Sequence, residues 1–276
     1  MSTSTRTRPA VRPGTVVAGA FVALVVVAAV APQLLTSDTP TQIDLRDALA
    51  APSWSHPFGT DEAGRDLLTR VIHGTGLSLG IGLGATGVSM ALAIVLGAVA
   101  ALVGGVLDTV VTRVLEVTFA FPSLLAALLI VTIYGPSVTT SIVAVGVGSM
   151  PGYARMVRGQ VLAVKESGYI ESAHALGHGP WTVFRRHLLP NAMRPLVAVV
   201  TLGIGQSIVW ASSLAFLGLG VPPPSPEWGA LLDAGRNYIT TSWWLAILPG
   251  LVIVAFAIAV TALGRSLQQR LEGAAR

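Results

Sequence analysis

Long uncharged stretches separated by short polar segments run along the whole chain. The hydrocarbon core of a bilayer is about 30 Å thick, and a helix crosses it in roughly 20 residues. The stretches therefore predict six transmembrane helices, two of them forming a tight hairpin within one long apolar run. The predicted helices cover residues 14–35, 76–103, 117–154 (two helices), 195–221 and 237–264. This pattern is typical of an all-α integral membrane protein.

Local helix breakers and aromatic residues mark the ends of these segments. Gly135 and Pro136 divide the run at 117–154, because a glycine next to a proline ends a helix and permits a turn. The prolines at 222–224 end the fifth helix. Trp243 and Trp244 occupy the interfacial position at which aromatic belts are found.

The composition agrees with a membrane protein and excludes several kinds of chemistry. The chain is 53% hydrophobic and 11% charged, with a mean hydropathy of +0.72. A soluble core of this size could not bury so much apolar surface. The sequence contains no cysteine, which excludes disulfides, thiolate metal sites and a cysteine nucleophile.

The basic residues predict how the chain is oriented. With six crossings, thirteen of the seventeen Lys and Arg residues fall on one face, and the positive-inside rule makes that face cytoplasmic. The tails at 1–13 and 265–276 and the long loop at 155–194 are then cytoplasmic, whereas 36–75 lies outside. The region 76–264 forms the core. The first helix resembles a signal sequence, but its apolar run is long and the site after Ala31 suits cleavage poorly, so we expect it to remain.

The cytoplasmic loop combines two short predicted helices with two glycines. Residues 166–176 form the first helix, Gly177 and Gly179 end it, and 180–188 form the second. Small residues on the first helix would let it enter a groove of another protein. The alternative is an amphipathic element lying on anionic lipid, with Arg185 and Arg186 at phosphates. The residue pattern alone leaves both open.

Two segments of this loop resemble a known motif. Glu171-Ser-Ala-His-Ala-Leu-Gly177 and Arg186-His-Leu-Leu-Pro190-Asn191 are similar to the EAA motif of ABC importer membrane subunits, with Ser172 in place of the first alanine. In that family the loop docks into a cleft of the ATPase subunit. The resemblance assigns ATPase coupling to Glu171, Ser172, Ala173, Ala175, Leu176, Gly177, Arg186 and Pro190.

Two further motifs narrow the resemblance to one group. His56-Pro-Phe-Gly-Thr-Asp61-Glu-Ala-Gly-Arg65-Asp66 and Leu214-Ala-Phe-Leu-Gly-Leu-Gly220 followed by Glu227-Trp-Gly229 are similar to the dipeptide/oligopeptide/nickel permeases, specifically their second, C-type subunit. This implies the type-I importer permease fold and short peptides as cargo, with glutathione and nickel chelates left open. Ala211 and Arg265 depart from the group, which usually has a glutamate and an aspartate there.

The resemblance also implies partners and a location. No G-x-x-x-x-G-K-[ST] sequence occurs, so this chain should bind no cofactor, and ATP and Mg should be bound by two separate ATPase subunits. We therefore expect a permease, not an enzyme. A second, related permease, an extracytoplasmic binding protein and membrane lipid complete the expected partners, with no nucleic acid. The expected location is the bacterial plasma membrane.

Four charged residues of the outer segment alternate in sign. Helical spacing would pair Asp61 with Arg65 and Asp66 with Arg70. The set could form the platform on which the binding protein docks, or it could be ordinary surface pairs of little energetic value. Both interpretations are kept.

Other polar and small residues are as consistent with packing between helices as with a role in the transport pathway. Gln206 lies within the fifth helix, where it could line the pathway or join helices. Arg113 and Glu116 are spaced to pair at the inner interface. Glycines at 76, 80, 84 and 87 favour close helix packing. The histidines form no plausible metal set.

Two other classes of protein remain as alternatives. An ion-coupled secondary transporter or channel acting without ATPases should carry ionisable residues at mid-membrane depth, and the predicted helices have none there. An intramembrane enzyme needs a facing nucleophile and base, yet every histidine lies at or beyond an interface. The sequence favours the importer subunit.

Overall fold

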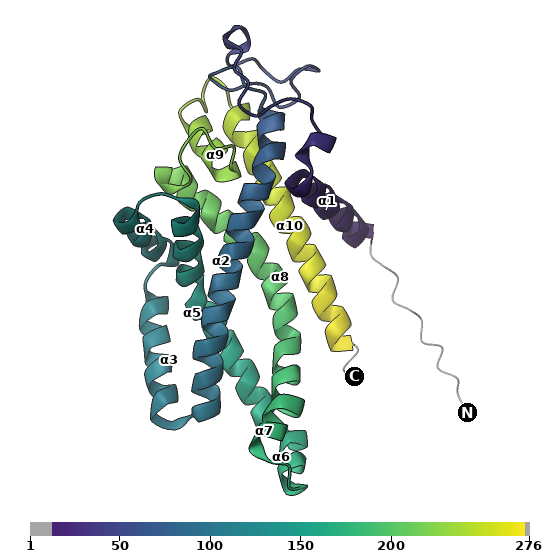
Figure 1. The fold of residues 1–276 in the computed structure, drawn as a ribbon, viewed down its shortest axis with the longest axis vertical. Helices are drawn as coiled ribbons and strands as arrows, with labels where there is room; N and C mark the ends of the chain where they lie inside the picture. Colours follow the sequence, from purple (N-terminus) through teal and green to yellow (C-terminus); the bar gives the residue numbers. More distant parts are fainter. Residues whose placement is uncertain (1–12, 274–276) are drawn as a thin grey trace, which may run out of the picture.

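Helices make up nearly all of the regular secondary structure in the part of the chain that the structure describes. The computed structural model describes residues 13–273, and the side chains of 13–270, so most of the predicted N-terminal tail and the last residues of the C-terminal tail lie outside it. In residues 13–273 an isolated bridge between Thr60 and Asp66 is the only β-pairing. The all-α class is confirmed (Figure 1). The α-helices are α1 Pro13–Val30, α2 Leu67–Val103, α3 Gly105–Ala120, α4 Ser123–Tyr134, α5 Val138–Lys165, α6 Gly168–Ala175, α7 Pro180–Thr182, α8 Leu189–Leu214, α9 Trp228–Arg236 and α10 Trp244–Gly273.

Shorter helical turns complete the chain. Two of them, η1 and η2, are 3-10 turns in the connection between α1 and α2, and two, η3 and η4, are π-helical turns at either end of α8. Their bounds are Pro32–Leu34, Leu45–Asp47, Val183–Leu188 and Ala215–Leu219.

Four helical segments of the described chain are long and apolar enough to cross a membrane: 13–30, 67–103, 180–219 and 244–270. The pair α3 and α4 would make a fifth span if counted together, although it is bent by 85°. Helix α5 has 28 residues, which is about 42 Å of helix at 1.5 Å per residue and enough to cross a bilayer. The count of six crossings therefore stays a prediction.

The structure corrects the predicted ends of the second and third helices. Helix α2 begins at Leu67, not near 76, because the Asp66 carboxylate caps it by accepting a hydrogen bond from the Thr69 N–H at 2.7 Å. The third helix begins at Gly105, not near 117. It then breaks before Pro122, where the proline forces Phe121 into an extended conformation. The predicted apolar run began at 117 because the charged residues Asp108, Arg113 and Glu116 precede it.

The centre of the molecule is formed by α2, which packs along α5 and crosses α8. These helices approach closely where α2 has glycine: a side chain on Gly97 would collide with the backbone of α5, and one on Gly82 with Ile208 of α8. The predicted glycine series at 76, 80, 84 and 87 is only partly an internal interface. Gly76 faces α1 and Gly84 faces α5, but a Cβ on Gly80 or Gly87 would meet nothing within 4 Å.

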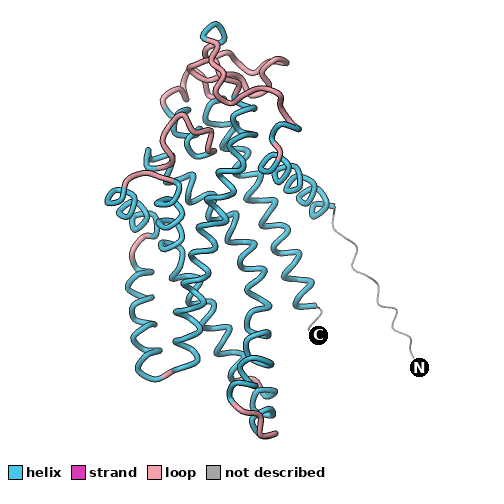
Figure 2. The backbone as a smooth tube through the Cα atoms, in the orientation of Figure 1, coloured by secondary structure: helices cyan, strands magenta, loops and turns pink. Residues whose placement is uncertain are grey.

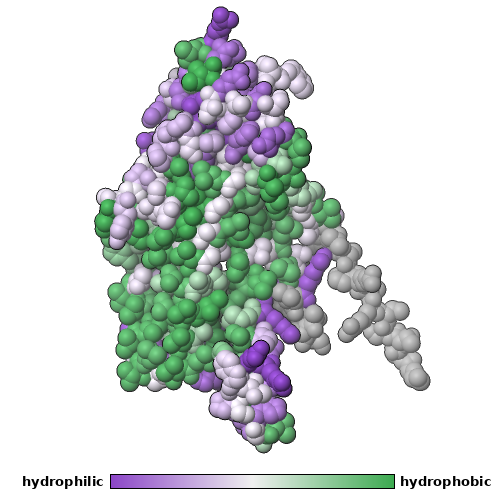
Figure 3. All heavy atoms as spheres, viewed as in Figure 1, coloured by the Kyte–Doolittle hydropathy of each residue, from purple (hydrophilic) through white to green (hydrophobic). Residues whose placement is uncertain are grey.

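The molecule is elongated, and polar residues gather at its two ends. The segment between α1 and α2, residues 31–66, forms a loop-rich end that we call the crown, and α6 and α7 lie at the opposite end (Figures 1 and 2). Between them the surface is a broad hydrophobic belt (Figure 3). Helix α1 packs on α10 and α2 beneath the crown. This distribution is that of a protein spanning a bilayer, with two polar ends available for partners.

Candidate functional sites at the elbow, the crown and the α8 face

The predicted loop forms a compact elbow, residues 166–188, between α5 and α8. Helix α6 ends where Gly177 adopts a φ of +78°, a conformation that favours glycine. The His178 N–H then donates to the Ala173 carbonyl at 3.1 Å and closes the helix end. The first predicted short helix and the glycine stop after it are confirmed, and a second helical segment begins at Pro180 as predicted.

The elbow has an inner and an outer surface. Ile170, Ala173, Val183 and Leu188 are buried in a cluster that continues into α5 and α8. Ala173 is only 4% exposed, so it packs within this chain and does not enter a partner's groove as its place in the motif suggested. The remaining predicted coupling residues are exposed: Glu171, Ser172, Ala175, Leu176, Gly177, Arg186 and Pro190.

Two large apolar side chains protrude from the outer surface of the elbow. Leu176 is 76% exposed and Trp181 is 68% exposed, with Trp181 stacked on Phe184 at 5.5 Å between ring centroids. Exposed apolar groups of this size mark protein or membrane contacts. Hydropathy alone does not predict that Trp181 is exposed, because it contains no information about which side of the helix is covered.

The elbow continues into α8 without a break. The second short helix was predicted to end at 188, and that end is wrong: the helical segment runs from 180 to 219. The π-helical turn η3 accommodates Pro190, whose missing N–H and ring prevent regular α-helical hydrogen bonding, and Asn191 Nδ2 donates to the His187 carbonyl at 2.6 Å. A displacement of the elbow would therefore move α8 directly.

The crown is organised around the buried Asp61 carboxylate. Arg65 Nε donates to Asp61 Oδ2 at 2.6 Å, which confirms the predicted pair, and Arg70 Nη1 donates to the same oxygen. The predicted pair between Asp66 and Arg70 was wrong, because Asp66 caps α2 and pairs with His56 Nδ1 at 3.0 Å. Asp61 and Arg70 are 3% and 4% exposed, so they stabilise the crown from inside.

A second buried carboxylate fixes α9 against α2. Glu227 Oε2 accepts from the Ala230 N–H at 2.8 Å, as the N-cap of α9, and Oε1 accepts from Ser78 Oγ at 3.1 Å. Ser78 Oγ in turn accepts from the Trp228 N–H at 2.9 Å. Burial raises the pKa of the Glu227 carboxyl, and these hydrogen bonds oppose the rise. Glu227 is only 3% exposed, so its side chain lies inside the molecule.

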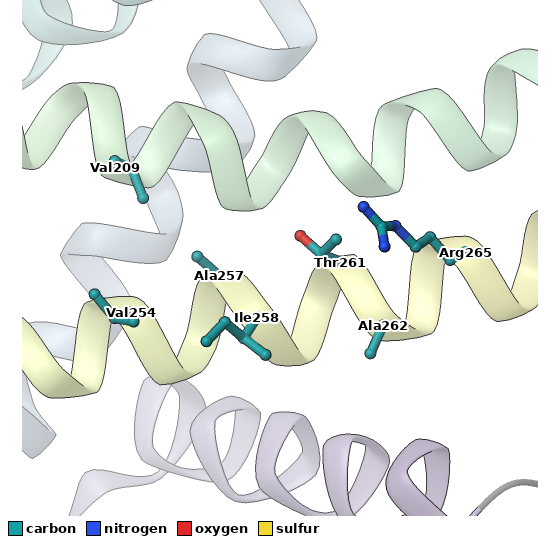
Figure 4. Close-up of a pocket in the computed structure, with 7 residues that line it drawn as sticks. All are labelled: Val209, Val254, Ala257, Ile258, Thr261, Ala262 and Arg265. Atoms are coloured by element: carbon teal, nitrogen blue, oxygen red, sulfur yellow. The ribbon is translucent and has the colours of Figure 1, made fainter.

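The exposed side of α8 carries the predicted pathway residue. Gln206 is exposed, and its Oε1 accepts a hydrogen bond from the Tyr153 hydroxyl of α5 at 3.2 Å, so it joins two helices and also faces outward. One turn further on, Val209 borders a groove of about 500 Å³ between α8 and α10. The groove is otherwise lined by Val254, Ala257, Ile258, Thr261, Ala262 and Arg265 (Figure 4).

The two departures from the group's motif lie in different surroundings. Ala211 is 8% exposed and packs in the cluster formed by α2, α4 and α5. Arg265 lines the α8–α10 groove, where its guanidinium points toward α8 (Figure 4). The groove therefore combines an apolar wall with one cationic end.

A bidentate ion pair joins α3 to α5 near the elbow. Arg158 Nε and Nη2 donate to the two Asp108 carboxylate oxygens at 2.6 and 2.7 Å. Sequence spacing could not indicate this pair, because its members are 50 positions apart. The predicted pair of Arg113 and Glu116 is confirmed at 2.8 Å and is exposed on α3.

These features define a class of protein: a multi-helix membrane subunit with a stiff loop at one polar end and an ordered crown at the other. The chain belongs to the family described as binding-protein-dependent transport system inner membrane component, whose profile matches residues 93–273. It is thus a multi-pass permease subunit of an ABC importer of the peptide group, as the motifs predicted, and ATP hydrolysis belongs to separate subunits of such systems.

Several characterised relatives cover most of the chain. A glutathione transport system permease protein (GsiD) of Pectobacterium atrosepticum is 38% identical over 93% of this chain and 86% of that protein. A probable D,D-dipeptide transport system permease protein (DdpC) of Escherichia coli is 33% identical over 94% and 87%. A di/tripeptide transport system permease protein (DppC) of Pseudomonas aeruginosa is 38% identical over 81% and 76%.

The fold is also similar to that of a solved transporter. A structure of the MetNI methionine ABC transporter in an inward-facing conformation matches with a TM-score of 0.60, at 19% identity, over 74% of this chain and 96% of that chain. At this identity the likeness concerns the fold alone. The family assignment excludes an ion-coupled transporter working without ATPases.

Proposed function

We propose that this subunit forms half of a pathway that imports short peptides, together with a second, related but non-identical permease. Two ATPase subunits, which bind the ATP and Mg, engage the elbow, and a binding protein delivers the solute at the crown. The elbow and both termini are then cytoplasmic, in the bacterial plasma membrane, and the crown lies outside. Support for the cargo comes from the relatives, whose names specify glutathione, D,D-dipeptides and di- or tripeptides.

The observation that carries the coupling role is the helical continuity from elbow to α8. Leu176 and Trp181 protrude from a loop whose inner side is packed on α5 and whose outgoing helix is continuous from 180 until the kink at Gly218. When an ATPase dimer bound to the elbow closes, it would tilt α8. The face of α8 that bears Gln206 would move with it. Alternating access then becomes a two-state equilibrium that ATP binding shifts.

The chemistry of the α8 face suits a small peptide. A peptide presents amide groups and a terminal carboxylate, and Gln206 and Arg265 offer an amide and a guanidinium that match them. The apolar wall of the α8–α10 groove can accept side chains of varied shape. We propose that this face, completed by the second permease, is the route of the solute.

Replacing Glu171 with leucine tests the coupling role. Glu171 is exposed on α6, so the substitution should leave insertion and abundance unchanged while it lowers peptide uptake at least tenfold and weakens retention of the ATPase subunits. Uptake in whole cells and co-purification of the ATPases are the measurements. Gly177 is a less clean target, because a side chain there would strain a positive φ.

A matched control is available at the other end of the molecule. The Glu62 carboxylate is exposed in the crown and pairs only at the surface with Arg65, at 3.1 Å. Glu62→Leu should leave ATPase retention at the wild-type level. Normal uptake by Glu171→Leu at normal abundance would refute the coupling role.

A further inference from the structure

Apart from Leu34 and Leu35, which follow shortly after α1, the crown exposes three large apolar side chains. Ile43 is 61% exposed, Leu45 is 73% exposed and Trp54 is fully exposed, at 103%. In Figure 3 a small hydrophobic patch lies among hydrophilic atoms of the crown, apart from the belt below. A soluble surface rarely displays a tryptophan in this way unless a partner covers it.

Trp54 is held in a defined turn. The Ser53 N–H donates to the His56 carbonyl at 2.9 Å, and the His56 N–H donates to Ser53 Oγ at 3.2 Å, which closes the loop around Trp54. The His56 ring is fixed to Asp66 at the start of α2. The indole therefore projects from a scaffold that is already ordered, and binding through it would cost little conformational entropy.

The turn and η2 belong to one surface. His56 Nε2 lies 3.8 Å from Asp47 Oδ2, and Thr60 Oγ1 donates to the Asp47 carbonyl, so the turn at 53–56 is tied to the segment that carries Ile43 and Leu45. Exposed charged residues flank the same segment, among them Asp44 and Arg46. An apolar centre within a polar rim is the usual anatomy of a protein interface.

We propose that Trp54, supported by Ile43 and Leu45, is the anchor on which the extracytoplasmic binding protein docks. This inference rests on the proposed function, which places the crown outside. It also revises the docking role predicted for Asp61, Arg65, Asp66 and Arg70: these residues hold the crown in shape, and the contact itself is made by the apolar group. A lipid contact is disfavoured because residues 43–54 belong to the crown, which is largely hydrophilic and lies beyond the belt (Figure 3).

The test compares two exposed tryptophans at opposite ends of the same subunit. The assembled transporter in nanodiscs is titrated with its solute-loaded binding protein, and the dissociation constant and the stimulation of ATP hydrolysis are measured. Trp54→Ala should weaken binding about tenfold or more, as expected of an aromatic anchor, and Trp54→Phe should weaken it less. Tyr134→Ala, at an exposed aromatic residue outside both the crown and the elbow, is the control that should leave this affinity unchanged, whereas Trp181→Ala should lower retention of the ATPase subunits.

The possible results distinguish a failure of the Trp54 anchor from a failure of the proposed function. If the wild-type transporter binds no binding protein, the proposed function itself fails. If the wild type binds and Trp54→Ala binds equally well, the anchor is refuted. Because the chain has no cysteine, Ser55→Cys can carry a single spin label, and a label immersed in lipid would overturn the docking surface in favour of a membrane contact.

Discussion

Two buried carboxylates in this protein are stabilised by different means. Asp61 is paired with the guanidinium groups of Arg65 and Arg70, and Arg70 Nη2 also donates to the Pro224 carbonyl at 3.2 Å. Glu227 has no such cation in its hydrogen-bonded shell, which consists of a backbone N–H and the Ser78 hydroxyl. Burial therefore favours the neutral form of Glu227.

Glu227→Gln should remove a pH-dependent part of the stability. Burial raises the folded-state pKa of Glu227, so the folded protein binds this proton more tightly than the unfolded chain does. The resulting contribution to the free energy of unfolding is fully present below the ordinary glutamate pKa of 4.5 and is lost as pH rises through the raised pKa. Thermal unfolding of both proteins across this range is the measurement. The Tm of the wild type relative to Glu227→Gln should fall with increasing pH, and parallel curves would contradict the assignment.

At the scale of elements, the elbow is connected to the bundle by more than its own chain. Helix α5 carries Arg158, which is bound to Asp108 of α3, and Lys165, whose Nζ donates to the carbonyls of Ala101 and Leu102 at the end of α2. A lysine at this position complements the negative end of the α2 dipole. The end of α5 that enters the elbow is thus tied to both neighbouring helices.

Asp108→Ala should destabilise the subunit by freeing α3 from α5. The charge-exchanged variant Asp108→Arg with Arg158→Asp should recover part of the loss, because it preserves the pair. Thermal unfolding and abundance in membranes report the effect. Arg113→Ala is the matched control on the same helix, since its partner Glu116 is an exposed neighbour and surface pairs contribute little. If the control lowers the Tm as much as Asp108→Ala does, the ion pair of Asp108 with Arg158 contributes no more to stability than the exposed pair.

At the scale of the whole molecule, the isolated subunit leaves polar groups uncovered in its apolar belt. Gln206 is exposed on α8 although α8 belongs to a membrane-crossing segment, and Arg265 points into an open groove. A polar side chain facing hydrocarbon is costly, so such a face is expected to meet water or another protein. The arrangement suits a subunit whose mate closes the pathway.

A single cysteine at Gln206 tests whether this face lines the pathway. The chain has no cysteine, so Gln206→Cys would be the only thiol in it. In the assembled transporter it should react with a polar thiol reagent, and ATP should change that rate several-fold as access alternates. Ser207→Cys is the neighbouring control. Ser207 is only 2% exposed, so a thiol at this position should react slowly in both states. A rate at Gln206→Cys that ATP does not change would refute a pathway position.

The sequence by itself determined the features that depend on local composition. Runs of about 20 apolar residues specify membrane helices, because a bilayer demands internally bonded backbone over that length. Gly177 fixes the end of α6, since its positive φ is a local requirement. The motif at 171–191 and the pair of Asp61 with Arg65, four residues apart, were visible for the same reason.

Only the tertiary structure decided which distant residues meet and which side chains turn outward. Arg70 pairs with Asp61 and not with Asp66, which is nearer in the sequence, and Arg158 pairs with Asp108. Helix packing sets the distances between these side chains, and sequence spacing does not. The same packing buried Ala173 and left Trp54 exposed. Hydropathy measures how a segment partitions into a membrane. It contains no information about the neighbours that cover each face of a helix, and those neighbours decide burial and pairing.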